Sequence, residues 1–236
     1  MSGFELKRGA RALIRENAPK LIFIGLVYII AITIISELQF QLPAPIAAYE
    51  QFLTLLSMGE VPSFQLFFGT IRTYGLVLSI LLGLMLPVVS LGFISYCLKI
   101  TRKKAGDYKD LLAGFSLFFK AILLSLMATV FILLWSLLFF FPGIAAHYRY
   151  RLVYYILLDD PKKSVIQCFR ESKRLMRRRK LDLFLIDLSF LGWVILSILV
   201  MSLIIPIFPV VSIWLTPYYG LTQAAFYNQV MNEATV

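Results

Sequence analysis

Apolar residues in this chain gather in stretches long enough to cross a membrane. Residues 73–98 and 121–146 contain no Asp, Glu, Lys or Arg. A helix of roughly 20 residues spans the hydrocarbon core, so each stretch predicts one membrane span. Residues 188–232 are also uncharged, but they are too long for one span and Pro206 and Pro209 interrupt them. We therefore predict two spans there, joined by a hairpin turn.

The first 20 residues carry apolar and basic positions at helical spacing. One face is apolar and consists of Leu6, Ala10, Leu13 and Ile14. The other faces are basic and carry Lys7, Arg8, Arg11 and Arg15. This pattern predicts an interfacial basic helix over residues 1–20, lying on the membrane surface. We expect Pro19 to end that helix and residues 21–36 to form the first span.

Charge divides the connecting segments into two kinds. Residues 37–70 contain Glu37, Glu50 and Glu60 but no Lys or Arg. Most of the 23 basic residues lie in three clusters, at residues 7–20, 99–120 and 162–180. Because Lys and Arg concentrate in cytoplasmic loops, we predict that these clusters are cytoplasmic and that residues 37–70 form an extracytoplasmic loop.

A fourth span follows from the same rule. If the second and third basic clusters lie on one side, the chain between them crosses an even number of times. The returning segment is then residues 143–158, with Pro142-Gly143 as the turn. This segment is the least lipid-like of the spans, and it is either a helix shielded inside the bundle or half of a re-entrant hairpin.

The predicted fold is therefore all-α. We expect one membrane-embedded domain over residues 1–236, a polytopic transmembrane helical bundle of about six spans with amphipathic cytoplasmic helices and both termini cytoplasmic. Pro87 and Pro217 are expected to kink or break the second and the sixth span. Broken helices bind solutes in some transporters, but kinks are also routine packing features of membrane helices.

Residues 162–180 are predicted to form a basic amphipathic helix on the inner leaflet. Asp159-Asp160-Pro161 precedes it as an acidic cap with Pro at the first helical position. Its apolar side carries Val165, Phe169, Leu175 and Met176. We expect inner-leaflet lipid contacts from its basic C-terminal part, which comprises Lys173, Arg174, Arg177, Arg178, Arg179 and Lys180.

Composition excludes an ordinary soluble fold, because 60% of the residues are hydrophobic and only 15% are charged. The chain has one His, and the HExxH, GxSxG and P-loop motifs of common enzymes are missing. Cys97 and Cys168 lack metal-ligand spacing and are expected to be free thiols. We therefore expect a non-enzymatic protein with no cofactor and no metal. The basic helix lacks stacking aromatic residues on its charged face, so we expect no nucleic acid partner.

Charged residues within the fourth span are the best candidates for a binding site, since buried charge is costly in a membrane. His147, Arg149 and Arg151, with Arg72 near the same surface, form either a basic vestibule for an anionic headgroup or solute, or anchors that pair with the acidic loop. The anchoring role is slightly favoured.

Asp187 lies about two turns inside the fifth span. It is either a proton relay or a structural residue bonded to Tyr154 or Tyr155, or paired over a longer distance with Arg151. The structural role is favoured.

Five blocks of sequence resemble, in order, the signature of the bacterial family called domain of unknown function 975. They are LWSLLFFFPGI at residues 134–144, YILLDDP at 155–161, ESKRLM at 171–176, DLSFLGW at 187–193 and PYYGLTQAAFY at 217–227. The resemblance implies a bacterial plasma-membrane protein and no particular activity. The family usually has a Gly after Leu175-Met176, where this chain has Arg177-Arg178-Arg179, and this departure puts a helix break there in doubt.

Two functions remain open. The favoured one is a non-enzymatic protein of the bacterial cell envelope whose partners are membrane lipids with anionic headgroups, with a membrane protein partner left open. The alternative is a small transporter or lipid-translocating protein that uses the basic fourth span and the Pro-broken sixth span. A polar cavity connecting Arg149 and Arg151 to Pro217 and Asp187 would favour the alternative.

Overall fold

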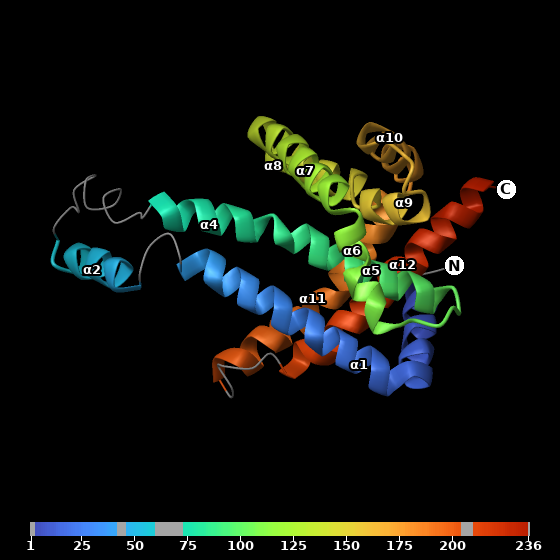
Figure 1. The fold of residues 1–236 in the computed structure, drawn as a ribbon, viewed down its shortest axis with the longest axis horizontal. Helices are drawn as coiled ribbons and strands as arrows, with labels where there is room; N and C mark the ends of the chain where they lie inside the picture. Colours follow the sequence, from blue (N-terminus) through green and yellow to red (C-terminus); the bar gives the residue numbers. More distant parts are fainter. Residues whose placement is uncertain (1–2, 42–45, 60–72, 204–209, 236) are drawn as a thin grey trace. The chain divides into compact units, whose positions relative to one another are not determined.

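The computed structural model describes residues 3–41, 46–59, 73–203 and 210–235 (Figure 1). All regular structure in these ranges is helical, as expected from the sequence. The helices are α1 (Gly3–Gln41), α2 (Ile46–Ser57), α4 (Thr73–Gly83), α5 (Met85–Thr101), η1 (Tyr108–Leu112), α6 (Ala113–Ser116), α7 (Phe118–Leu138), α8 (Phe140–Arg149), α9 (Val153–Asp159), α10 (Val165–Leu175), α11 (Lys180–Leu203) and α12 (Val210–Thr235).

The chain forms two compact units. The first comprises residues 1–29 with 87–236, and the second comprises residues 30–86. The second unit contains the predicted loop 37–70, but α1 extends to Gln41 and α2 occupies residues 46–57 of that range. The Pro206 and Pro209 turn lies outside the described residues, as does Glu60.

Four helical segments in the described ranges are long and apolar enough to cross a membrane, namely Gly3–Gln39, Gly75–Thr101, Phe118–Leu138 and Lys180–Val200. The predicted count of six is not confirmed. Helix α8 has 10 residues, and at about 1.5 Å per residue it covers only half of a ~30 Å hydrocarbon core. Helix α12 has 26 residues but is less apolar than these four segments.

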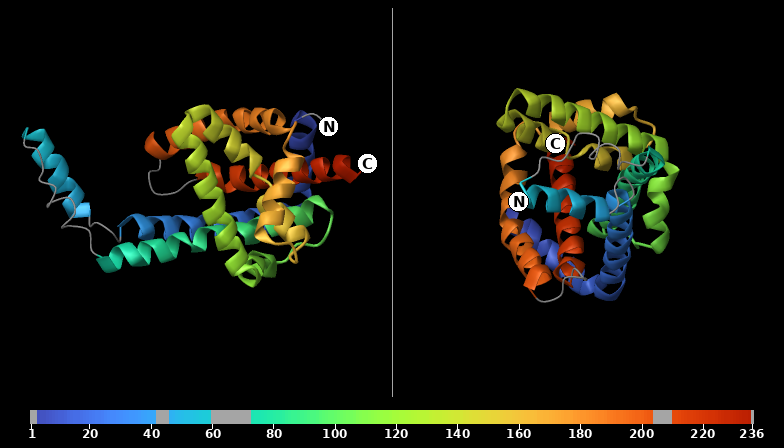
Figure 2. Two further views of the ribbon diagram at one scale, coloured as in Figure 1. Left: turned by 90° about the horizontal axis from the view of Figure 1, so that it is seen from above. Right: turned by 90° about the vertical axis from the view of Figure 1, so that its left-hand side faces the viewer.

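Helix α12 is less apolar because it lies in the core of the first unit, where its polar side chains find partners. It packs beside α11 (Figure 2), and both Tyr218 and Tyr227 are completely buried. The helix continues through Pro217, so the predicted break in the sixth span is wrong. Instead, Pro217 packs against Gly25 of α1, where a Cβ atom would lie 3.1 Å from the ring.

The apolar face of the N-terminal segment is buried as its spacing indicates, but α1 bends near Pro19 and does not end there. Leu6, Ala10 and Ile14 are buried, and α1 has a non-helical residue at Asn17, two residues before Pro19. The proline cannot donate a helical hydrogen bond, so the helix bends there. The Asn17 side chain donates to the carbonyl of Leu13 at 3.1 Å, which satisfies one carbonyl at the bend.

The turn between α7 and α8 lies at Phe139, whose backbone is extended, and not at Pro142-Gly143 as predicted. Pro142 is tolerated in the first turn of α8, where amide donors have no helical partner. Gly143 serves packing instead, since a Cβ atom there would lie 2.1 Å from Ser136 Oγ. The two helices form a closely packed hairpin.

Two predictions about the basic helix are wrong. Helix α10 begins at Val165, and Ser164 before it forms a capping box with Gln167, so Asp159 and Asp160 do not cap it. The helix ends at Leu175, and α11 begins at Lys180. A Gly is unnecessary at this break because none of the residues 176–179 adopts a positive φ.

Backbones approach most closely where η1 and α6 lie against α5. A Cβ atom on Gly92 would lie 1.9 Å from the carbonyl oxygen of Leu111, and one on Gly114 would lie 1.9 Å from that of Val88. Only glycine fits at this reciprocal contact. Small residues permit such close packing between membrane helices.

Candidate functional site

A chain of hydrogen bonds links α11, α12 and the segment between α8 and α9. Arg151 donates through Nη2 to the hydroxyl of Tyr219 at 2.6 Å, and that hydroxyl donates to Asp187 Oδ1 at 3.0 Å. Gln223 Nε2 donates to the same carboxylate oxygen at 2.8 Å. The predicted association of Asp187 with Arg151 is thus made through Tyr219. Tyr219 and Gln223, not Tyr154 or Tyr155, hold the carboxylate.

This network borders a cavity of about 350 Å³. Of the residues predicted for a site, four line the cavity, namely His147, Arg151, Tyr154 and Tyr155. The lining residues that sequence reasoning missed include Tyr28, Phe93, Tyr150, Tyr219 and Gln223. Six of the sixteen lining residues are Phe or Tyr, and Arg151 and Gln223 are among the polar ones.

One acceptor in the cavity wall lacks a partner. Gln223 is only 3% exposed, and its Oε1 atom is buried without a hydrogen bond to the described residues. Its amide cannot be turned over without cost, because Oε1 would then face the carboxylate of Asp187. Arg151 has five N–H donors, of which Tyr219 takes one. The cavity thus presents both an acceptor and donors.

The predicted four-residue vestibule is not assembled in the part of the chain that the structure describes. Arg72 lies outside the described residues. The Arg149 guanidinium lies 5.5 Å from the centre of the Trp135 ring, away from the lining of the cavity. The backbone carbonyl of Arg149 accepts a 2.8 Å hydrogen bond from the buried Ser172 hydroxyl, which connects the end of α8 to α10.

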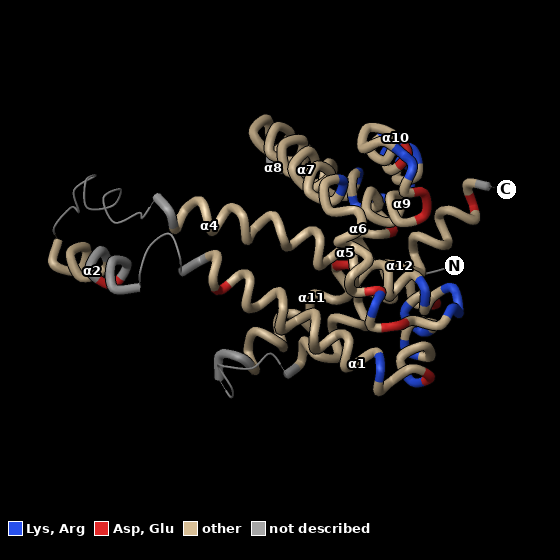
Figure 3. The backbone as a smooth tube through the Cα atoms, viewed as in Figure 1, with Lys and Arg blue, Asp and Glu red and all other residues tan. Residues whose placement is uncertain are grey.

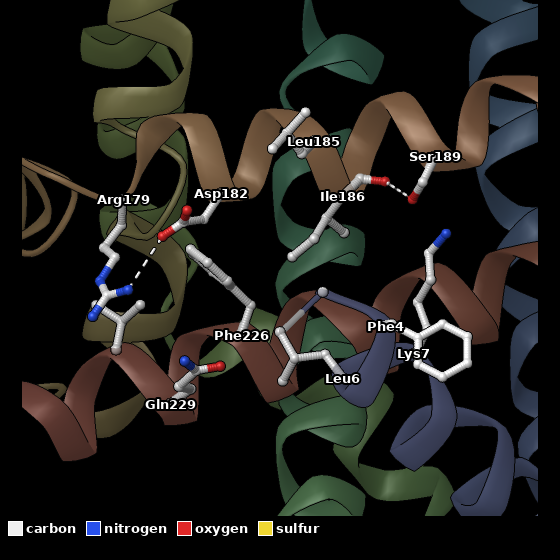
Figure 4. A pocket seen from close by; sticks show the side chains of 12 residues that line it. Phe4, Leu6, Lys7, Arg179, Asp182, Leu185, Ile186, Ser189, Phe226 and Gln229 are labelled. Atoms are coloured by element: carbon white, nitrogen blue, oxygen red, sulfur yellow. Dashed lines mark hydrogen bonds and ion pairs between the residues drawn. The ribbon is translucent and has the colours of Figure 1, made fainter. Parts of the chain in front are cut away.

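Charged residues of the first unit gather near the N-terminus of α1, the α5–η1 connection and α10, whereas α7 is uncharged beyond its first turn (Figure 3). A second cavity at this end has a volume of about 360 Å³ and lies between α1, α11 and α12 (Figure 4). Phe4, Leu6 and Ile186 contribute apolar walls, and Lys7 and Arg179 contribute cations. This cavity therefore combines apolar walls with cationic side chains.

The predicted lipid-contact residues do not behave alike. Lys173, Arg174, Arg177 and Arg178 are exposed, and we call them the basic surface. Arg179 is paired with both Asp182 and Glu233, and Lys180 is half-buried. A hollow of about 370 Å³ is lined by Arg174, Arg177 and Arg178 of the basic surface, together with Arg179 and Glu233.

Asp159 has a structural role that the sequence does not predict, because its position before Pro161 suggests a helix cap. It accepts two hydrogen bonds from Arg102, at 2.6 and 2.9 Å, and a third from the Tyr227 hydroxyl at 2.7 Å. Burial raises the pKa of this carboxyl, but the bonds from Arg102 and Tyr227 outweigh it and hold the pKa below its usual value. This forked ion pair fastens the end of α9 to α5 and α12.

The missed residues of α12 do share a signal in the sequence. Tyr219, Gln223 and Tyr227 are four residues apart, so they form one polar stripe along α12. In the described residues, no group of three or more His, Cys, Asp or Glu side chains is placed to hold a metal ion.

One of three comparisons with known proteins gives a match, and it covers the part of the chain that contains α11 and α12. Neither the curated proteins nor the solved structures include a match to this chain. Residues 137–234, from the end of α7 to the last turn of α12, match the family model described as Protein of unknown function (DUF975). Over that range, which contains Arg151, Asp187 and the basic surface, the resemblance to the family of the domain of unknown function 975 is confirmed.

Proposed function

We propose that this chain is a non-enzymatic protein of the bacterial plasma membrane that binds anionic lipid headgroups through its basic surface. The observation that carries the proposal is the hollow beside α10. Three exposed arginines line it, and Glu233, the acid among its lining residues, is already bound by Arg179. The charge of Arg174, Arg177 and Arg178 is therefore available to an external anion.

Neighbouring acids are likewise engaged elsewhere. Glu171 pairs with Lys163 at 2.7 Å, and Asp182 pairs with Arg179 at 3.2 Å. Each Lys or Arg near an anionic leaflet adds about 1 kcal/mol of binding free energy. Arg also offers forked donors that match phosphate oxygens. Phospholipid phosphates are therefore suitable ligands for this surface.

Neutralising the hollow tests this function. In the triple variant Arg174→Gln, Arg177→Gln, Arg178→Gln, we expect the affinity of the purified full-length protein for phosphatidylglycerol to fall at least about tenfold, because up to about 3 kcal/mol of attraction is lost. Lipid binding is measured in detergent micelles at two salt concentrations. Wild-type binding should weaken as salt rises, since the Debye length is about 8 Å at physiological ionic strength.

A matched control removes three exposed cations elsewhere at the charged end, as Lys103→Gln, Lys104→Gln, Lys109→Gln. This control should retain most of the affinity. Equal losses in both triple variants would mean that total charge, and not the hollow, governs binding. Wild-type binding of phosphatidylglycerol that does not weaken as salt rises would reject the proposal.

The proposed orientation places both termini and the basic surface in the cytoplasm. Ser172 is completely buried, so the exposed Lys173 is the better labelling position. We expect Gly59→Cys to react with an impermeant maleimide in intact cells, and Lys173→Cys to react only after permeabilisation. The native Cys97 and Cys168 are buried and should give little background. The opposite labelling pattern would reverse the orientation.

A transporter or lipid-translocating role is the second candidate, and the aromatic cavity is the observation that favours it. The cavity joins Arg151 to Thr216 and Gly220, on either side of Pro217, and the hydrogen bonds reach Asp187. Arg149 does not take part, and α12 is continuous at Pro217. The sequence features that favour this role are thus only partly present in the fold.

A further inference from the structure

We propose that the cavity bordered by Arg151 and Gln223 is a binding site for a compact zwitterion. Such a ligand carries an ammonium group and an anionic oxygen group a few bonds apart. The site is distinct from the basic surface, and either proposal can fail without the other.

The charges around the cavity argue against a simple anion. The Arg151 guanidinium and the Asp187 carboxylate are both bound to the Tyr219 hydroxyl, so opposite charges lie one hydroxyl group apart. With His147 neutral, these two groups balance. A ligand with both signs of charge complements this arrangement, whereas a lone anion would meet the field of Asp187 as well as that of Arg151.

The hydrogen-bonding groups in the cavity wall also favour a ligand with both signs of charge. Gln223 Oε1 is buried without a partner among the described residues and requires a donor. Arg151 retains N–H donors beyond the one given to Tyr219, and these require an acceptor. An ammonium group at Gln223 and an anionic oxygen at Arg151 would satisfy both together.

The aromatic wall suits the ammonium end of the ligand. Tyr28 and Phe93 are stacked with ring centres 4.3 Å apart, and Tyr150, Tyr154 and Tyr155 line the cavity with them. Aromatic faces attract cations, most strongly where water is excluded. A volume of about 350 Å³ lies at the lower end of ordinary ligand pockets, so the ligand is small.

Two sources supply this chemistry, a free small molecule and the headgroup of a zwitterionic lipid. His147 lies in the lining and is exposed, so the cavity reaches the outer surface of the helices there. Phosphoethanolamine serves as the free probe and phosphatidylethanolamine as the lipid probe. A response to the free probe assigns a soluble ligand, and a response to the lipid alone assigns a headgroup.

The test is thermal unfolding of the full-length protein in an uncharged maltoside detergent. At about ten times its Kd, a zwitterionic probe should raise the Tm by roughly 3 °C. Inorganic phosphate and ethanolamine, the two halves of the headgroup, should each raise it by less than half as much. A rise with phosphate alone that equals the rise with phosphoethanolamine would show an anion site. No rise with either zwitterionic probe would overturn the proposal.

Substitutions test whether the rise in Tm comes from binding in this cavity. The double variant Arg151→Gln, Asp187→Asn removes both charges together and should abolish the rise. Gln223→Met removes the unpartnered acceptor at similar size and should raise the Kd at least about tenfold. If the double variant does not fold, the Kd of Gln223→Met alone tests the proposal. Arg149→Gln removes an arginine two residues away, outside the cavity, and should keep the full rise. Loss of the rise in Arg149→Gln but not in Gln223→Met would overturn the assignment.

Discussion

Replacing Gly92 with Ala is expected to lower the free energy of unfolding by about 3 kcal/mol or more, which corresponds to a fall in Tm of roughly 6 °C or more in detergent. The new Cβ atom would lie 1.9 Å from the carbonyl oxygen of Leu111, and both partners are backbone. No side-chain rotation relieves that contact, so α5 and the η1–α6 segment have to separate. Gly114→Ala should act alike, because its Cβ would lie 1.9 Å from the carbonyl oxygen of Val88.

Two other helical glycines provide the control for this prediction. Cβ atoms on Gly9 and Gly192 would have nothing within 4 Å. Since Ala favours a helix over Gly by about 0.5–1 kcal/mol, Gly9→Ala and Gly192→Ala should leave the Tm unchanged or raise it. A fall in Tm of similar size in all four variants would show that the close contact is not the cause.

Removing one charge from the Arg151–Tyr219–Asp187 chain is the second large effect. We expect Arg151→Met or Asp187→Asn alone to destabilise the protein by about 2 kcal/mol, because each leaves the opposite charge without its compensation. The double variant should be destabilised by less than the two single variants taken together. Reversible unfolding of the four proteins in mixed micelles measures this coupling.

Additive destabilisation by the two single substitutions would count against charge compensation between Arg151 and Asp187. If the single effects add within about 0.5 kcal/mol, Arg151 and Asp187 act independently in spite of their shared hydroxyl. Arg149→Met serves as the matched control, since its guanidinium lies over Trp135 and has no place in the chain of hydrogen bonds. Its coupling with Asp187→Asn should be close to zero.

The features most accurately predicted from sequence are those that depend on local periodicity. Leu6, Ala10 and Ile14 are buried as their spacing indicates, and the helix bends near Pro19. Long uncharged stretches coincide with membrane-length helices at Gly75–Thr101 and Phe118–Leu138. In each case neighbouring residues alone determine the outcome, so no knowledge of tertiary partners is needed.

Predictions that depend on tertiary partners are the ones that fail. Asp159 precedes a proline and a helix, which is typical of a cap, but Arg102 and Tyr227 bind it. Ser164, with Gln167 three residues later, carries the better capping signal. For Asp187 the sequence favours Tyr154 or Tyr155, whereas its partners are Tyr219 and Gln223 of α12 together with Tyr148 of α8.

Arg149 and Arg151 are close in sequence, and this closeness alone favours a shared site. Residues two apart on a helix point to different sides, and here α8 ends at Arg149. One guanidinium therefore lies on Trp135 and the other reaches Tyr219. The polar stripe of Tyr219, Gln223 and Tyr227 is present in the sequence, but its significance depends on which helix it faces.

The hydrogen bond from Ser172 to the carbonyl of Arg149 has a thermodynamic consequence. It joins α10, which carries part of the basic surface, to the segment that positions Arg151. A ligand that shifts the equilibrium of either element therefore acts on the other through this contact. Linkage requires the effect to be reciprocal: the factor by which a bound zwitterion changes the affinity for anionic lipid equals the factor by which that lipid changes the affinity for the zwitterion. The Ser172→Ala variant, which removes the hydroxyl, should bring that factor toward one.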